Sequence, residues 1–396
     1  MEPPPTDDQP APASPTADPE KAPATETKTS TASSAQPKVV KSAPPTKPKR
    51  AVPIWVWVVV GVVVVGGAAI IGYIVMQPGK SSSVASQNTN TASVQQLVPR
   101  LLDGVPVPPE QARTNTYAVM IENQIDARPQ SALDKASVVY EALAEGGITR
   151  FMALFPGGGS KLAQIGPVRS ARPYFITEAE EYHPLYVHAG GSPQALSYLS
   201  SGKANVVDFN QFYHGGNFIR DNARLAPHNL YTDSDKLFLG LKQVAPTLVP
   251  TYTSWTFKDE APLDSRPTTV NDIAINFSSF NYNVKYTYDR VNNQYQRFEG
   301  GKAHVMRDGS QIDAKDVVVE FVPTSPLPGD KERLQMSLVG TGKLLLFRDG
   351  TAVQGTWKKD SNTGRTQFLD ASGNVLALNP GSIWIELVPT DRQVTD

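Results

Sequence analysis

Two glutamates flank a glycine turn in the segment EALAEGGITRF, which runs from Glu141 to Phe151. Glu141 and Glu145 lie four residues apart, and Arg150 opens the apolar run that follows the turn. Two carboxylates near one turn could act as general acid and general base on a glycosidic bond, and their separation would set the stereochemistry. They could also pair with nearby arginines and fix the loop. The spacing leaves both interpretations open, and Arg150 is a candidate ligand-binding residue.

Two arginines precede a predicted helix in the segment IGPVRSARPYF. Arg169 and Arg172 are three residues apart, and Pro173 suits the first turn of a helix. Guanidinium groups beside the free N–H groups of a helix start are well suited to bind a carboxylate or a phosphate. The same arginines could instead neutralise Glu141 and Glu145. The two interpretations are compatible in a protein without its ligand.

A histidine and a serine flank a glycine pair in the segment YVHAGGSPQAL. His188 ends a predicted strand, where an imidazole could serve as an acid, a base or a hydrogen-bond donor. Ser192 and Pro193 take the N-cap and first positions of a predicted helix. The segment lacks the G-x-S-x-G spacing of a nucleophile elbow, so we expect Ser192 to cap the helix. A ligand-binding role stays open, because a glycine-rich turn can cradle an anion with its backbone.

A fourth polar segment, RLAPHNLYT, ends a long connection that begins at Asn210. Connections of this length without secondary structure tend to be binding loops. His228 and Asn229 could therefore reach the same cleft as His188. Two histidines and a glutamate could hold zinc, but the sequence has no H-E-x-x-H or other helical ligand spacing. We expect no metal and no cofactor.

Strands that alternate with helices must position these segments. The expected strands are Tyr117–Ile121, Val138–Ala142, Arg150–Phe155, Leu185–Ala189 and Val206–Phe209, and the expected helices are Tyr174–His183, Pro193–Ser200 and Lys236–Ala245. Ser234 or Asp235 is the expected N-cap of the last helix. The alternation predicts an α+β or α/β domain over residues 97–250.

The pattern changes beyond a linker at residues 251–267, which prolines punctuate. The expected strands are Asp272–Phe277, Asn283–Tyr288, Gln294–Phe298, Asp316–Val322, Lys343–Arg348, Thr351–Lys358 and Ser382–Val388. Turn signals such as Asp308-Gly309 separate them. The sequence therefore predicts a second, mainly β domain over residues 268–390.

One apolar segment is long enough to cross a bilayer. Residues 54–76 contain no charge, and as a helix they would span about 35 Å. Five positive charges lie between Lys38 and Arg50, against the single Lys80 just after the span. This bias predicts a cytoplasmic N-terminus and an extracytoplasmic C-terminal body. The span is too long and begins too late for a cleaved signal peptide, so we expect a single-pass anchor in the lipid bilayer.

Composition describes the segments on either side of this span. Residues 1–50 contain twelve of the 34 prolines and no aromatic residue, so we expect a disordered cytoplasmic tail. Residues 77–96 are rich in Ser, Asn and Thr and predict a flexible stalk. The net charge of -1 argues against a nucleic-acid partner. The absence of cysteine excludes disulfides and thiol catalysis.

The four polar segments, with ENQIDARPQSAL from Glu122 to Leu133, resemble the bacterial YerB-like lipoprotein family, catalogued as a pair of adjacent domains of unknown function. The resemblance covers Leu101 to Pro389, where LLLFRDGTAVQGTWKK and LNPGSIWIELVP are similar to the second domain. It implies a two-domain envelope protein outside the membrane and no established reaction. The chain departs from the lipoprotein pattern in its predicted transmembrane helix and its lack of cysteine, which changes the expected anchor and not the compartment.

Three hypotheses follow for function. The first is an envelope protein that binds an anionic or polyhydroxylated ligand, such as a cell-wall glycan or peptide, through the arginines and histidines of these segments. The second is a hydrolase or lyase of the same polymer, with Glu141 or Glu145 as acid and base. The third is a scaffold or regulator that contacts other envelope proteins. The first is favoured because four polar segments converge at the ends of strands and helices.

Overall fold

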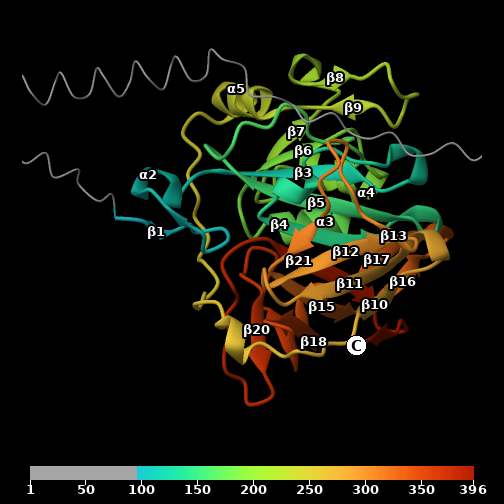
Figure 1. Cartoon of the computed structure of the whole chain (residues 1–396). Coiled ribbons are helices and arrows are strands. Elements are labelled where there is room, and N and C mark those ends of the chain that lie inside the picture. The colour runs from blue at the N-terminus through green and yellow to red at the C-terminus, as the bar shows by residue number, and fades with distance from the viewer. Residues whose placement is uncertain (1–95) are drawn as a thin grey trace, which may run out of the picture. The chain divides into compact units, whose positions relative to one another are not determined.

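The computed structural model describes residues 96–396, which belong to one compact unit (Figure 1). The predicted tail, the predicted membrane span and almost all of the predicted stalk lie outside the described residues. Within residues 96–396, no helix combines the length and the apolar character that a membrane crossing requires.

A ten-stranded sheet forms the centre of the body. In spatial order its strands are β20 (Gln367–Asp370), β19 (Thr351–Lys359), β18 (Gly340–Arg348), β15 (Asp316–Val322), β21 (Ile383–Pro389), β4 (Val138–Leu143), β5 (Thr149–Pro156), β3 (Thr116–Glu122), β6 (Leu185–His188) and β7 (Val207–Asn210). β21 pairs in parallel with β4, so strands from the two halves of the chain join in the middle of one sheet.

The remaining strands form smaller sheets. The six-stranded sheet contains β13 (Lys302–Ala303), β12 (Gln294–Glu299), β11 (Asn283–Asp289), β10 (Ile273–Asn276), β22 (Val394–Thr395) and β14 (Asp313–Ala314). The two-stranded pairs are β1 (Val98–Pro99) with β2 (Pro106–Val107), β8 (Ile219–Arg220) with β9 (Leu230–Tyr231), and β16 (Thr324–Leu327) with β17 (Asp330–Met336).

Helices are few and short. The α-helices are α2 (Pro109–Ala112), α3 (Pro173–Ala179), α4 (Pro193–Ser200) and α5 (Ser234–Val244). Single 3₁₀ turns are η1 (Ile125–Ala127), η2 (Leu133–Lys135), η3 (Glu145–Gly147), η4 (Gly215–Asn217), η5 (Leu263–Ser265) and η6 (Phe280–Tyr282). The body is thus mostly sheet with few helices, and its C-terminal region is mainly β.

Two elements have the bounds that the sequence predicts, and others begin or end at different residues. The helix expected over Tyr174–His183, for example, is Pro173–Ala179. The helix over Pro193–Ser200 and the strand over Asp316–Val322 are confirmed residue for residue. The expected cap of α5, Ser234 or Asp235, is wrong. The cap is Asp233, whose carboxylate accepts from the backbone N–H of Lys236 at 2.8 Å. The β16–β17 hairpin was not expected at all.

Both faces of the central sheet are buried. Along β3, Val119 belongs to the apolar cluster on one face and Met120 to the cluster on the other, which is the alternation that a strand imposes. The first cluster includes Ile275 of the six-stranded sheet and Leu237 of α5, and the second includes Phe175 of α3. Burial on both faces explains why the central strands are nearly continuous apolar runs.

The segment expected as a linker packs against the C-terminal region. Trp255 is buried, and its indole N–H donates to the carbonyl of Thr366 at 2.9 Å. The backbone N–H of Lys258 also donates to the carbonyl of Leu378 at 2.9 Å.

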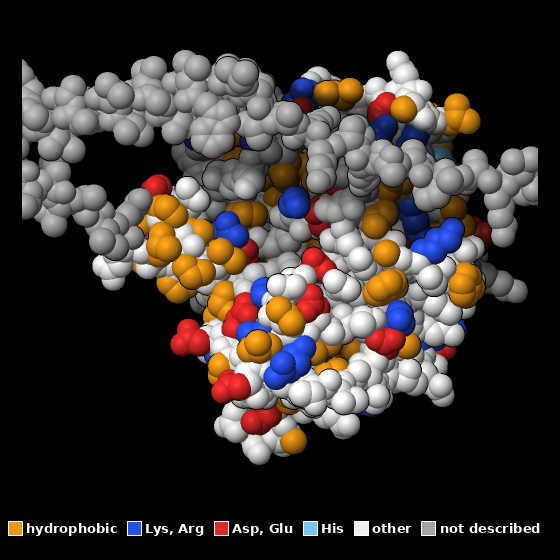
Figure 2. All heavy atoms as spheres, viewed as in Figure 1, with side chains coloured by type: hydrophobic (Ala, Val, Ile, Leu, Met, Phe, Trp, Pro, Cys, Tyr) orange, Lys and Arg blue, Asp and Glu red, His pale blue; other side chains and the backbone are white. Residues whose placement is uncertain are grey.

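On the face of the molecule shown in Figure 2, acidic and basic side chains lie interspersed among hydrophobic ones.

Candidate functional site

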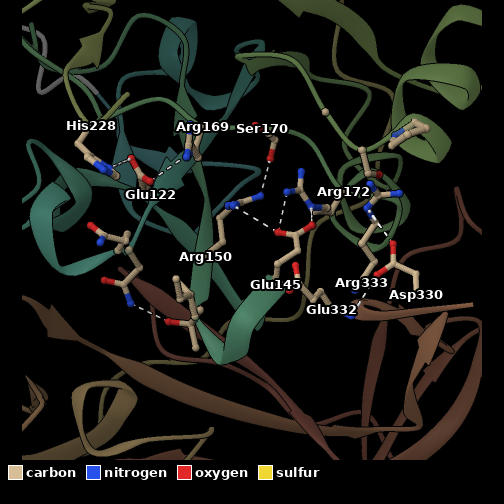
Figure 3. A pocket seen from close by; sticks show the side chains of 17 residues that line it. Glu122, Glu145, Arg150, Arg169, Ser170, Arg172, His228, Asp330, Glu332 and Arg333 are labelled. Carbon is tan, nitrogen blue, oxygen red and sulfur yellow. Dashed lines mark hydrogen bonds and ion pairs between the residues drawn. The ribbon is translucent and has the colours of Figure 1, made fainter. Parts of the chain in front are cut away.

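A cavity of about 470 Å³ lies where the end of β3, the start of β5, the starts of α3 and α4, and the β16–β17 hairpin meet (Figure 3). Its lining is polar and carries charges of both signs. The lining residues are Glu122, Asn123, Gln124, Glu145, Ile148, Thr149, Arg150, Arg169, Ser170, Arg172, Gly191, Ser192, Pro193, His228, Asp330, Glu332 and Arg333.

The central sheet sets the position of two of these residues. Glu122, the last residue of β3, and Arg150, near the start of β5, are register partners in the antiparallel ladder. Directly opposite residues in such a ladder project to the same face. The 3₁₀ turn η3 precedes β5, and its Gly146 and Gly147 have φ of 64° and 72°. Only glycine adopts this left-handed backbone without strain, so the glycine pair brings Glu145 to the cavity.

Arg172 holds Glu145 through both carboxylate oxygens. Nη2 of Arg172 donates to Oε2 at 2.6 Å, and Nε donates to Oε1. Burial alone would disfavour the carboxylate, but the hydrogen bond and charge of Arg172 outweigh it, so the pKa of Glu145 lies below its usual value. Glu145 is therefore an ionised structural partner of Arg172 at neutral pH.

A second group lies around Glu122. Its Oε1 is 2.9 Å from Nε of Arg169, and its Oε2 is 3.1 Å from Nδ1 of His228. Figure 3 shows Arg169 and His228 reaching the carboxylate from two sides. Although these atoms are close, Oε2, Nε and Nδ1 are not aligned as hydrogen bonds. These buried polar atoms are therefore left without a hydrogen bond in this group.

Arg150 is a buried cation that lacks a close carboxylate partner. It is 7% exposed, its Nη1 donates to the carbonyl of Ser170 at 3.0 Å, and its Nε has no hydrogen-bond partner. The nearest carboxylate atom in an ion pair, Oε2 of Glu145, is 3.8 Å from its Nη2. Burial and the neighbouring charge of Arg172 lower the pKa of Arg150 to about 10. This guanidinium therefore offers its charge and donors to the cavity.

The hairpin closes the cavity from the C-terminal half of the chain. β17 packs against η3 and α3 and brings Asp330, Glu332 and Arg333 to the lining. Nε of Arg333 lies 3.3 Å from Oδ2 of Asp330, while Oδ1 accepts from the backbone N–H of both Glu332 and Arg333. Asp330 is thus occupied in holding the turn.

Six of the residues expected from the sequence line this cavity. They are Glu145, Arg150, Arg169, Arg172, Ser192 and His228. Ser192 also caps α4, as predicted, because its hydroxyl accepts from the backbone N–H of Ala195 at 3.3 Å. The other three expected residues, Glu141, His188 and Asn229, do not line it.

Glu141 lies in the interior instead of the cleft where we expected it. Its side chain is fully buried and pairs with the equally buried guanidinium of Arg297, from β12. Glu386 of β21 is its register partner. The separation of Glu141 from Glu145 follows from their elements, because Glu141 points from the middle of a covered strand and Glu145 from a turn.

His188 also lies outside the cavity and is fully buried. Its Nε2 is 2.6 Å from Oδ1 of Asp208, and its Nδ1 is 2.7 Å from the carbonyl of Gly190. Each ring nitrogen therefore has a hydrogen-bond partner. β6 lies between β3 and β7, which explains the burial, and the contact with Asp208 ties β6 to β7.

Asn229 serves the long connection in which it lies. Its Oδ1 accepts from Nη1 of Arg220 at 2.8 Å, and its Nδ2 donates to the carbonyls of Asp221 and Arg224. All its side-chain polar atoms are therefore used within the loop. This arrangement holds the loop that presents the neighbouring His228 to the cavity.

Sequence reasoning missed eight polar lining residues. They are Glu122, Asn123, Gln124, Thr149, Ser170, Asp330, Glu332 and Arg333. Glu122 directly follows the predicted strand Tyr117–Ile121, which in the structure extends over Thr116–Glu122. Pro328-Gly329-Asp330 is a turn signal that could have located the hairpin. Within residues 96–396, no group of three or more His, Asp or Glu side chains is arranged to hold a metal ion.

Two family models match the chain. Residues 102–246 match "Protein of unknown function (DUF3048) N-terminal domain", and residues 273–385 match "Protein of unknown function (DUF3048) C-terminal domain". The cavity lies between elements of both matched regions, since the hairpin belongs to the second.

Relatives support the same assignment. "Putative lipoprotein YerB" from Bacillus subtilis (strain 168) is 32% identical over 293 residues, which are 73% of this chain and 85% of that protein. The crystal structure of YerB protein from Bacillus subtilis has a TM-score of 0.66 at 30% identity and covers 76% of this chain and 100% of that chain. The chain therefore belongs to the DUF3048 family, with both its N-terminal and its C-terminal domain.

Proposed function

We propose that this chain is a membrane-anchored, extracytoplasmic envelope protein that binds a ligand through an anionic group in the cavity around Arg150. The ligand would be a cell-wall glycan or peptide that carries a carboxylate or a phosphate. The compartment is supported by the predicted span and its flanking charges. It is also supported by the name of the Bacillus subtilis relative, which describes that protein as a lipoprotein.

The burial of Arg150 is the observation that carries the ligand proposal. The guanidinium is 7% exposed, its Nε has no hydrogen-bond partner, and its nearest carboxylate is 3.8 Å away. Burying a charge with so few partners costs free energy in the folded state. An anionic ligand would supply the missing counter-charge and hydrogen bonds. Arg169, which lines the same cavity, would add a second positive charge near that group.

Binding is favoured over hydrolysis by the state of the two glutamates. A general acid needs a carboxyl group with a raised pKa, whereas the pKa of Glu145 is lowered by Arg172. Glu141 does not line the cavity and pairs with buried Arg297. A scaffold or regulatory role in the envelope stays a prediction from the sequence.

The test is binding of the full-length chain, purified in detergent micelles, to soluble fragments released from purified cell walls. Arg150→Met removes the charge and keeps much of the side-chain volume. We expect it to weaken binding about 10- to 100-fold, the range for charge-assisted hydrogen bonds. Arg113→Met is the matched control, because Arg113 is exposed and lies outside the cavity. Equal binding by Arg150→Met and the unaltered chain would refute the proposal.

A further inference from the structure

The cavity carries four arginines and four carboxylates. The arginines are Arg150, Arg169, Arg172 and Arg333, and the carboxylates are Glu122, Glu145, Asp330 and Glu332. Three of the carboxylates have an arginine within ion-pair distance that lines the same cavity: Glu122 has Arg169, Glu145 has Arg172, and Asp330 has Arg333. Outside these three pairs remain one cation, which only shares Glu145 with Arg172 at a longer distance of 3.8 Å, and one anion.

The two remaining charges are Arg150 and Glu332. Glu332 is exposed on β17, and among the described side chains it has no ion-pair partner. The neighbouring Asp330 is not available to bind a cation, because its carboxylate is already engaged by Arg333 and by two backbone N–H groups. Figure 3 shows the hairpin residues on the side of Arg150 opposite to Glu122 and His228. The lining therefore offers, at different places, a cation without a carboxylate of its own and an anion without an ion-pair partner.

We propose that the ligand is zwitterionic: its anionic group binds Arg150, and an ammonium group binds Glu332 on the β16–β17 hairpin. This inference rests on the proposed function and narrows it to amine-bearing peptide fragments. A polyanion would meet four carboxylates in the lining, and a neutral glycan would leave the Arg150 charge without a partner. A ligand with one charge of each sign complements both Arg150 and Glu332. The hairpin is then the element that determines specificity.

The test compares three preparations of the same soluble cell-wall fragments on the full-length chain. One preparation is untreated, one has its amines acetylated, and one has its amines reductively dimethylated. Acetylation removes the positive charge, whereas dimethylation adds bulk and keeps the charge. We expect acetylation to weaken binding about two- to fivefold, as for a solvent-accessible ion pair, and dimethylation to leave it nearly unchanged.

Glu332→Gln should abolish the difference between untreated and acetylated fragments, while it leaves binding of acetylated fragments unchanged. Glu110→Gln is the matched control, since Glu110 is exposed and outside the cavity. Equal binding of untreated and acetylated fragments by the unaltered chain would overturn the zwitterion inference and leave the proposed function standing. No binding of any preparation would overturn both. A preference for untreated fragments that survives Glu332→Gln would refute the assignment to Glu332.

Discussion

Glu122 and Arg150 are register partners on β3 and β5, but the carboxylate of Glu122 lies 2.9 Å from Nε of Arg169. The carboxylate directly across the ladder from Arg150 is therefore paired with Arg169 and not with Arg150. The other nearby carboxylate, Glu145, is held by both donors of Arg172. A buried arginine without its own counter-ion is the physical basis of the proposed binding site.

Removing the Arg150 charge is expected to stabilise the protein without ligand. Burial lowers the pKa of Arg150 to about 10, so the charged form is held at a cost in the folded state. Arg150→Met removes this cost but loses the hydrogen bond to Ser170, and we expect a net gain of about 1–2 kcal/mol in the free energy of unfolding. Urea denaturation followed by tryptophan fluorescence measures the change. Arg113→Met should stay within about 0.5 kcal/mol, and a clear loss of stability in Arg150→Met would contradict the argument.

The Glu145–Arg172 pair predicts a loss of stability in acid. The pKa of Glu145 is lower in the folded state than in the unfolded chain, so the unfolded chain binds its proton first as pH falls. The stabilisation is complete above the unfolded value of 4.5 and is lost as pH falls through the folded value. Glu145→Gln should therefore be less stable than the unaltered chain at neutral pH, and the difference should shrink in acid. A difference in free energy of unfolding that stays constant with pH would contradict this assignment.

A buried acidic cluster predicts the opposite trend at higher pH. Burial, opposed by Lys359 and reinforced by Glu181, raises the pKa of Glu178 to about 8. Between these two values, the folded state keeps a proton that the unfolded chain has released. The resulting stabilisation is complete below pH 4.5 and is lost as pH rises through about 8. Between about pH 4.5 and about pH 8 the free energy of unfolding should fall, and this contribution should level off above that range. Glu178→Gln, which mimics the protonated form, should flatten this decline, and Glu110→Gln should not.

Glu141 is expected to contribute to stability and not to ligand binding. Its partner Arg297 is fully buried, so Glu141→Ala would leave a charge in the interior with a weaker set of partners. Breaking a buried pair in this way costs about 3–5 kcal/mol. Chemical denaturation of Glu141→Ala tests the expectation, and Glu145→Ala, at a partly exposed carboxylate, should cost less. Reduced fragment binding by Glu141→Ala at unchanged stability would return Glu141 to the list of binding candidates.

Local sequence features determined most of the elements of this fold. Pro193 behind Ser192 specifies the start of α4, and the apolar run Asp316–Val322 specifies β15. Both elements can be predicted from the sequence, because a helix cap and a buried strand are recognised from a few consecutive residues. The same logic located Glu145, Arg150, Arg169 and Arg172 at the ends of elements, where binding groups gather.

Only the tertiary structure decided which of the polar residues meet. Glu141 and Glu145 are four residues apart, but Glu141 pairs with Arg297, 156 residues away, and Glu145 pairs with Arg172. The hairpin that brings Glu332 to the cavity likewise comes from the other half of the chain. Ion pairs between distant segments depend on how strands are ordered in the sheet, and no local pattern records that order. The sequence thus determined the elements and the chemistry at their ends, and the sheet determined the site.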